Sequence, residues 1–147
     1  MTALGSYLAQ SATVRPAVQP AIDKVRSCAE SPSSGQAAIQ QAINTRQHIL
    51  TDLHGLSPGG LPDSAQLIST LTAAMRDSVN ADRYYQNWMA DFASAGTPCG
   101  SSSAQNPNFA AGQEASARAT ADKTAFLSIW NPLAPSYGQR TYSATGF

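Results

Sequence analysis

Apolar residues recur at every third or fourth position over four long segments of this chain, and strand-like alternation does not persist. Such spacing places the apolar side chains on one face of an α-helix. The segments span residues 2–29, 34–55, 63–95 and 107–130, and an irregular tail follows from 131 to 147. Because the connections are short, we expect an all-α, antiparallel up-down-up-down four-helix bundle that forms a single domain.

Capping signals support the expected helix starts. Ser33 with Gln36, and Asp63 with Gln66, have the spacing of a capping box. Asn106-Pro107 places a capping side chain before a proline at the first helical position. Pro16 and Pro20 interrupt the first segment, so we expect a kink or a short break near Arg15.

The composition suits a compact helical domain. Of the 147 residues, 26 are alanine, the best helix former, whereas leucine, isoleucine, valine and phenylalanine together number 24. Nine basic and nine acidic residues balance, which argues against a nucleic-acid-binding protein because such proteins usually present a basic face. No stretch approaches 18 consecutive apolar residues, so we expect no membrane span.

Two cysteines bear on the cellular compartment. Cys28 ends the first expected helix and Cys99 follows the end of the third. These two helices run in the same direction in the expected bundle, which places both cysteines at one end, so we expect a Cys28–Cys99 disulfide and a location outside the cytoplasm. The alternative is a pair of buried thiols. The segment after Met1 has neither a basic region nor an apolar region typical of a signal peptide.

Motifs for catalysis or metal binding are absent from the sequence. His48 and His54 are the only histidines, and His48 with Asp52 supplies only two ligands of one helix face. The chain has no Gly-x-Ser-x-Gly elbow, and the loop from Ser57 to Pro62 lacks the Gly-Lys-Ser/Thr ending of a phosphate-binding loop. We therefore expect a non-enzymatic protein with no metal and no cofactor.

Three charged residues occupy core-type positions near the middle of their helices: Arg46, Asp82 and Asp122. A buried charge must be paired, because an unpaired one is very costly. One interpretation is a structural arginine–carboxylate network that sets the helix register. The others are that the helix faces rotate and the charges reach solvent, or that the three residues line a polar ligand pocket inside the bundle.

Aromatic residues gather on the third and fourth helices. Tyr84, Tyr85 and Trp88 lie on the third, and Trp130 lies on the fourth. At helical spacing such residues usually form core, although these four are also candidates for an aromatic contact surface. Tyr84 lies off the apolar face, so we expect it to be exposed or covered by the tail. The tail carries three further aromatic residues, which predict that it packs back on the bundle: Tyr137, Tyr142 and Phe147.

A characteristic set of residues extends over roughly 15–140: Arg26-Ser27-Cys28, Leu61-Pro62, Ser78, Ala81-Asp82-Arg83-Tyr84-Tyr85, Trp88, Cys99, Gly112, Ala115-Ser116, Ala119, Lys123, Phe126, Trp130-Asn131-Pro132-Leu133-Ala134 and Tyr137-Gly138. This set resembles an extracytoplasmic helical domain of actinobacterial proteins. That domain forms the C-terminal segment of some membrane-anchored serine/threonine-kinase-like proteins and also occurs as stand-alone exported proteins. The resemblance implies an exported location and the disulfide, and it brings no catalytic residue. This chain would then be a trimmed domain or a protein whose anchor was removed.

The resulting expectation is a non-enzymatic extracytoplasmic sensor or interaction module of the cell envelope. One alternative is a small-ligand-binding bundle with an internal polar pocket around Arg46, Asp82 and Asp122. Another is a structural or self-assembling surface protein. The partner is then an unknown protein or small molecule, and the oligomeric state does not follow from the sequence.

Overall fold

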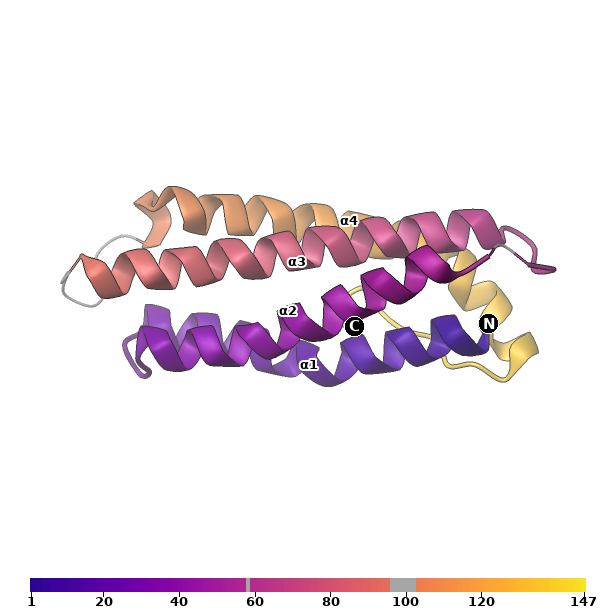
Figure 1. The fold of residues 1–147 in the computed structure, drawn as a ribbon, viewed down its shortest axis with the longest axis horizontal. Helices are drawn as coiled ribbons and strands as arrows, with labels where there is room; N and C mark the ends of the chain where they lie inside the picture. Colours follow the sequence, from indigo (N-terminus) through magenta and orange to yellow (C-terminus); the bar gives the residue numbers. More distant parts are fainter. Residues whose placement is uncertain (58, 96–102) are drawn as a thin grey trace.

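Four long helices form an up-down-up-down bundle in the computed structural model, which describes residues 1–57, 59–95 and 103–147 (Figure 1). They are α1 (Thr2–Arg26), α2 (Pro32–Gly55), α3 (Ser64–Ser94) and α4 (Pro107–Leu133). Short 3-10 helices flank α4, namely η1 (Ser103–Gln105) and η2 (Ala134–Tyr137). No strand occurs in the described ranges, so the expected all-α bundle with a C-terminal tail is confirmed. None of the helices described is long and apolar enough to cross a lipid bilayer.

The helix starts differ in detail from the expected caps. Ser31 is the cap of α2, and its hydroxyl accepts a hydrogen bond from the Ser34 amide at 3.3 Å. The expected capping box at Ser33 and Gln36 is therefore wrong. The Gln36 side chain instead donates to the main-chain carbonyl of Gln86 on α3 at 3.1 Å, so it joins two helices rather than closing one.

The other two caps are at the expected residues. Asn106 caps α4, and its side-chain oxygen accepts from the amides of Asn108 and Phe109 at 2.9 and 3.2 Å. Asp63 precedes α3, but its backbone is left-handed with φ of 55°, and its side chain makes no capping hydrogen bond. Only its carbonyl joins the helix, as the acceptor for the Leu67 amide at 2.8 Å.

Prolines do not break the helices that contain them. The helix α1 continues through Pro16 and Pro20, so the expected break near Arg15 is absent, and α4 continues through Pro132. Each proline removes one backbone donor and leaves one carbonyl without its helical partner. Pro16 and Pro20 are exposed, so water can hydrate those carbonyls, while buried Val14 and Val18 hold the opposite face in the core.

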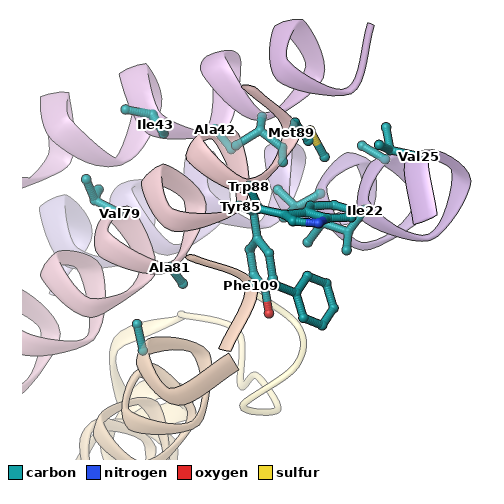
Figure 2. Packing of buried hydrophobic residues seen from close by; sticks show 14 of the residues in the cluster. Ile22, Val25, Ala42, Ile43, Val79, Ala81, Tyr85, Trp88, Met89 and Phe109 are labelled. Carbon is teal, nitrogen blue, oxygen red and sulfur yellow. The ribbon is translucent and has the colours of Figure 1, made fainter. Parts of the chain in front are cut away.

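Two apolar clusters fill the bundle, and each contains one tryptophan. The Trp88 cluster consists of Val14, Val18, Ala21, Ile22, Val25, Ile39, Ala42, Ile43, Val79, Ala81, Tyr85, Trp88, Met89, Phe109 and Ala115. The Trp130 cluster consists of Leu4, Leu8, Ile49, Leu53, Leu67, Leu71, Met75, Phe126, Leu127, Trp130, Ala134 and Phe147. Figure 2 shows Tyr85 and Phe109 side by side in the Trp88 cluster, with ring centroids 5.7 Å apart and edge to face. Gly112 permits this packing, because a Cβ there would lie 2.9 Å from the Tyr85 ring.

A layer of buried polar side chains separates the two clusters. Its members are Ser11 on α1, Arg46 on α2, Ser78 and Asp82 on α3, and Lys123 on α4. On α2 the polar layer marks the boundary between the clusters. Ile43 belongs to the Trp88 cluster and Ile49 to the Trp130 cluster, and Arg46 lies between them. Every long helix thus contributes to one polar layer across the middle of the bundle.

Neighbouring helices of the bundle do not all pack equally closely against one another. Packing is extensive between α1 and α2, α2 and α3, and α3 and α4, whereas the backbones of α1 and α4 come close to each other at few positions. The tail returns from the end of α4 to the middle of the bundle and covers part of this side (Figure 1). It is held by the Trp130 indole, which donates to the Arg140 carbonyl at 2.9 Å, and by Asn131, which donates to the Tyr142 carbonyl at 2.9 Å. Phe147 is fully buried, so the expectation that the tail packs back on the bundle is confirmed.

Candidate functional site

An ion pair between Arg46 and Asp82 lies at the centre of the polar layer. The Arg46 Nη1 atom donates to the Asp82 Oδ2 atom, which joins α2 to α3. The two residues are only 1% and 3% exposed. Two of the three core-type charges found in the sequence therefore meet inside the bundle, as expected for a structural arginine–carboxylate contact.

Opposing effects act on the charge of Asp82. Burial raises the pKa of its carboxyl, and the neighbouring Arg46 guanidinium, through its charge and its hydrogen bond, lowers that pKa again. Burial is the larger effect, so the pKa of this carboxyl lies above its ordinary value. The Arg46 Nε atom is buried and has no hydrogen-bond acceptor within the described part of the chain.

Asp122, the third expected member, does not reach this pair. It lies partly exposed, and its carboxyl pKa is raised by partial burial and by the nearby Asp77 carboxylate on α3. Lys123 takes the inward position instead and is 3% exposed. Residues 122 and 123 both lie three or four positions from the buried Ala119 and Phe126, so both suit the buried helix face. The long alkyl stem of lysine can lie along apolar neighbours there, whereas the short side chain of aspartate cannot.

Lys123 connects α4 to the tail. Its Nζ atom donates to the main-chain oxygen of Phe147 and lies 5.0 Å from the centre of the Phe147 ring. Burial lowers the pKa of this ammonium group from 10.5 to about 7, and the positive charges of Arg46 and Arg15 act in the same direction. The lysine is thus poised to gain or lose its proton near neutral pH.

A polar cleft opens between α1 and α4, above the ion pair. Its charged lining consists of Arg15, Arg46, Lys123 and Asp82, and its hydroxyl groups come from Ser78, Tyr85, Ser116 and Thr120. The cavity volume is about 20 Å³, enough for one body of the size of a water molecule. Three basic side chains and one carboxylate line the cleft. Lys123 also donates to the main-chain oxygen of Phe147, the last residue of the sequence. Arg15, Ser116 and Thr120 are partly or fully exposed, so the cleft communicates with solvent.

A larger cavity of about 190 Å³ lies at the N-terminal end of α1 and has a different lining. Its lining is mainly apolar and includes Met1, Leu4, Leu56, Leu61 and Ile68. It carries no charged side chain in the described lining. The charged site of this bundle is therefore the cleft between α1 and α4.

The candidate aromatic contact surface is wrong for three of its four residues. Tyr85, Trp88 and Trp130 are buried in the two apolar clusters, whereas Tyr84 is 37% exposed. Trp130 stacks on Phe126 with ring centroids 5.7 Å apart. These rings form core because they lie on the same helix faces as the aliphatic residues, and only Tyr84 lies off that face.

The remaining candidate residues lie outside the cleft. His48 Nδ1 lies 3.2 Å from Asp52 Oδ2 on the surface of α2. Within the described ranges, no group of three or more His, Cys, Asp or Glu side chains could hold a metal ion. Cys28 is exposed just after α1, with φ of 65°. Cys99 lies outside the described residues, so its pairing with Cys28 stays a prediction.

Comparison with protein-family models, with curated proteins and with solved structures finds no match for this chain. The resemblance to an actinobacterial extracytoplasmic domain therefore stays a prediction.

Sequence reasoning missed Arg15 and Lys123 as members of the site. Arg15 lies beside the buried Val14 and precedes Pro16, so it looked like the position of a helix break. Lys123 was hidden by its neighbour Asp122, which fits the same helical spacing. Lys123 lies three residues before Phe126 and Asp122 lies four residues before it. Both spacings place the residue on the same helix face as Phe126, so the sequence supported Lys123 as well as Asp122.

The ion pair makes a prediction about stability. Asp82→Ala leaves the Arg46 charge buried without its carboxylate, so we expect a loss of about 3–5 kcal/mol in the free energy of unfolding. The double variant Arg46→Met with Asp82→Leu removes both charges and should be more stable than Asp82→Ala alone. Urea unfolding of the unsubstituted protein, Arg46→Met, Asp82→Leu and the double variant measures the coupling between the two side chains.

The control for this cycle is Asp23→Ala, which removes a surface pair with Arg26. Its effect should stay within about 1 kcal/mol. A loss from Asp82→Ala as small as that of the control would contradict a buried, mutually dependent pair.

Lys123 makes a prediction about pH. Its pKa is about 7 in the folded protein and 10.5 in the unfolded chain, so the unfolded chain binds more protons between these values. Stability must then rise as pH increases through this range, by about 2 kcal/mol between pH 7 and pH 9. Urea unfolding of Lys123→Met should lack this rise.

Lys24→Met is the matched control, because Lys24 is exposed on α1. This variant should keep the pH dependence of the unsubstituted protein. If the free energy of unfolding rises equally with pH in Lys123→Met and Lys24→Met, Lys123 is not the source of the pH dependence and the prediction is contradicted.

Proposed function

We propose that this chain is a non-enzymatic binding module, a sensor or interaction domain, whose recognition site is the polar cleft between α1 and α4. The observation that carries the proposal is the gathering of four charged side chains and several hydroxyl groups in a partly enclosed cleft. Arg15, Arg46 and Lys123 line it with Asp82 as their only acidic counterpart in the described lining. Groups held in such electrostatically unfavourable surroundings cluster at functional sites.

The chemistry of the lining favours binding over catalysis. The one carboxylate is paired with Arg46, so it is a poor candidate for a general base. The serine and threonine hydroxyls need an adjacent base to act as nucleophiles, and the described lining contains neither histidine nor cysteine. Hydroxyls and cations without such a base are suited to holding a polar ligand.

Three small probes of different charge test this function: formate, formamide and methylammonium. We expect at least one of them to raise the melting temperature, because a ligand that binds only the folded state stabilises it. Ser116→Tyr places a ring at the cleft and should abolish that shift. Ser128→Tyr, at an exposed position of the same helix, should leave it unchanged. No shift with any probe, or equal shifts in both variants, would overturn the binding proposal.

We also propose that the module acts outside the cytoplasm, as part of the cell envelope. The resemblance described above supports this location. So does the topology, because α1 and α3 end at the same end of the bundle (Figure 1). Cys28 follows the first of these ends by two residues and Cys99 follows the second by five. The proposed disulfide would join these two ends.

Thiol titration tests the location. Protein purified without reductant and unfolded in guanidinium should show no reactive thiol, and reduction should release two, since the chain has two cysteines. Two reactive thiols before reduction would contradict the disulfide and remove its support for an exported module.

A further inference from the structure

We propose that the apolar cavity at the N-terminal end of α1 binds a small, mainly hydrocarbon molecule, of the size of benzene or a short-chain alcohol. This site is separate from the polar cleft between α1 and α4, and the inference does not depend on the function proposed for that cleft. Its ground is the volume of the cavity, the chemistry of its walls and its opening to solvent.

Three segments of the chain form the walls of this cavity. The first turn of α1 contributes Leu4, and the beginning of α3 contributes Ser64 and Ile68. The connection between α2 and α3 supplies a further wall, which includes Leu56 and Leu61. The cavity therefore lies where the beginning of one helix meets the turn between two others.

Two residues with left-handed backbones shape the connection between α2 and α3. They are Gly60, with φ of 28°, and Asp63, with φ of 55°. The Ser64 amide closes the turn by donating to the Leu61 carbonyl at 3.3 Å. A residue other than glycine is strained in this conformation, and residues held under such strain cluster at functional sites and ligand clamps. The wall that contains Leu61 is thus built into the fold.

The side chains of the described lining suit a hydrocarbon. None of them is charged, and most are aliphatic. Contact with aliphatic walls removes the apolar surface of a ligand from water, which favours binding in proportion to the area buried. Ser57 and Ser64 add two hydroxyl groups, which can bond a single polar group of the ligand. The lining therefore favours a hydrocarbon with at most one hydroxyl group.

The volume of the cavity limits the size of this ligand. It is about 190 Å³. An apolar cavity of about 150 Å³ is enough to bind benzene. Drug-sized molecules require pockets of about 300 Å³ or more. The ligand should therefore be about as large as benzene or a six-carbon alcohol.

The cavity opens to solvent at the end of the core. Leu4 is buried and belongs to the Trp130 cluster, whereas Leu56, Leu61 and Ile68 are half-buried. A ligand can therefore enter without unfolding of the bundle. Once bound, it covers apolar surface of these three side chains and extends the Trp130 cluster. Because this state binds the ligand and the unfolded chain does not, the ligand should raise the melting temperature.

NMR of isoleucine δ1-methyl groups is the direct test. Ile68 lines the cavity, whereas Ile39 and Ile43 belong to the Trp88 cluster. Benzene added to the full chain should shift the Ile68 signal until the site is saturated, because its ring current acts on nearby methyl groups. The signals of Ile39 and Ile43 should not move. Equal shifts of all three signals, or no saturable shift of Ile68, would overturn the proposal.

A series of straight-chain alcohols tests the apolar character of the site. Dissociation constants of propan-1-ol, butan-1-ol, pentan-1-ol and hexan-1-ol are measured from the same Ile68 signal. Each added methylene that is buried should strengthen binding by roughly fourfold. An affinity that does not rise from propan-1-ol to hexan-1-ol would contradict a hydrocarbon site.

Variants that fill the cavity test its position. Ala3→Trp adds a ring from the α1 wall and Ile68→Trp adds one from the α3 wall. Both variants should lose the saturation transfer from protein to benzene while keeping their helical circular dichroism. The matched control is Ala17→Trp, at an exposed position of α1 outside the described lining, which should keep the transfer. Benzene binding that persists in both filling variants would place the ligand elsewhere and overturn the proposal.

The variant Ser116→Tyr separates this site from the polar cleft. It changes the cleft and leaves the described walls of the apolar cavity intact. Benzene should therefore bind Ser116→Tyr as tightly as the unsubstituted protein, whether or not any ligand binds in the cleft. Loss of benzene binding in Ser116→Tyr would contradict a separate apolar site.

Discussion

The buried ion pair of Arg46 and Asp82 is the interaction on which the rest of this bundle depends. The contact joins α2 to α3 directly, so these two helices must meet in one register for the charges to pair. A shift of one helical turn would bury two uncompensated charges, which costs several kcal/mol. Apolar residues alone would specify this register less strictly, because alanine-rich helix faces offer many similar packings.

The polar layer built around this pair also explains why one side of the bundle stays open. The tail seals the side between α1 and α4 over the Trp130 cluster, where Phe147 is buried against Phe126. Its last contacts are with Arg15 and Lys123, at the level of the polar layer. The charged cleft, which Arg15 and Lys123 also line, lies at this level. Fold, tail and cleft thus follow from one transverse arrangement of polar residues.

The sequence predicted the elements of this arrangement better than their contacts. Periodicity was sufficient for the four helices, and the cap at Asn106 followed from its side chain and the proline after it. Arg46 and Asp82 were identifiable because a charge at an apolar position stands out. Asp122 was chosen over Lys123 because spacing alone does not distinguish adjacent residues. Arg15 joins the cleft only through the way α1 lies beside α4, which is a tertiary property and leaves no local pattern.

The division of the core into two clusters gives the molecule a built-in pair of optical reporters. Each cluster contains one of the chain's two tryptophans, Trp88 and Trp130, and a polar layer lies between them. The Trp130 indole is hydrogen-bonded to the tail, whereas Trp88 contacts Phe109 at the start of α4. Intrinsic fluorescence can therefore register detachment of the tail through one ring while the other ring reports on the opposite half of the bundle.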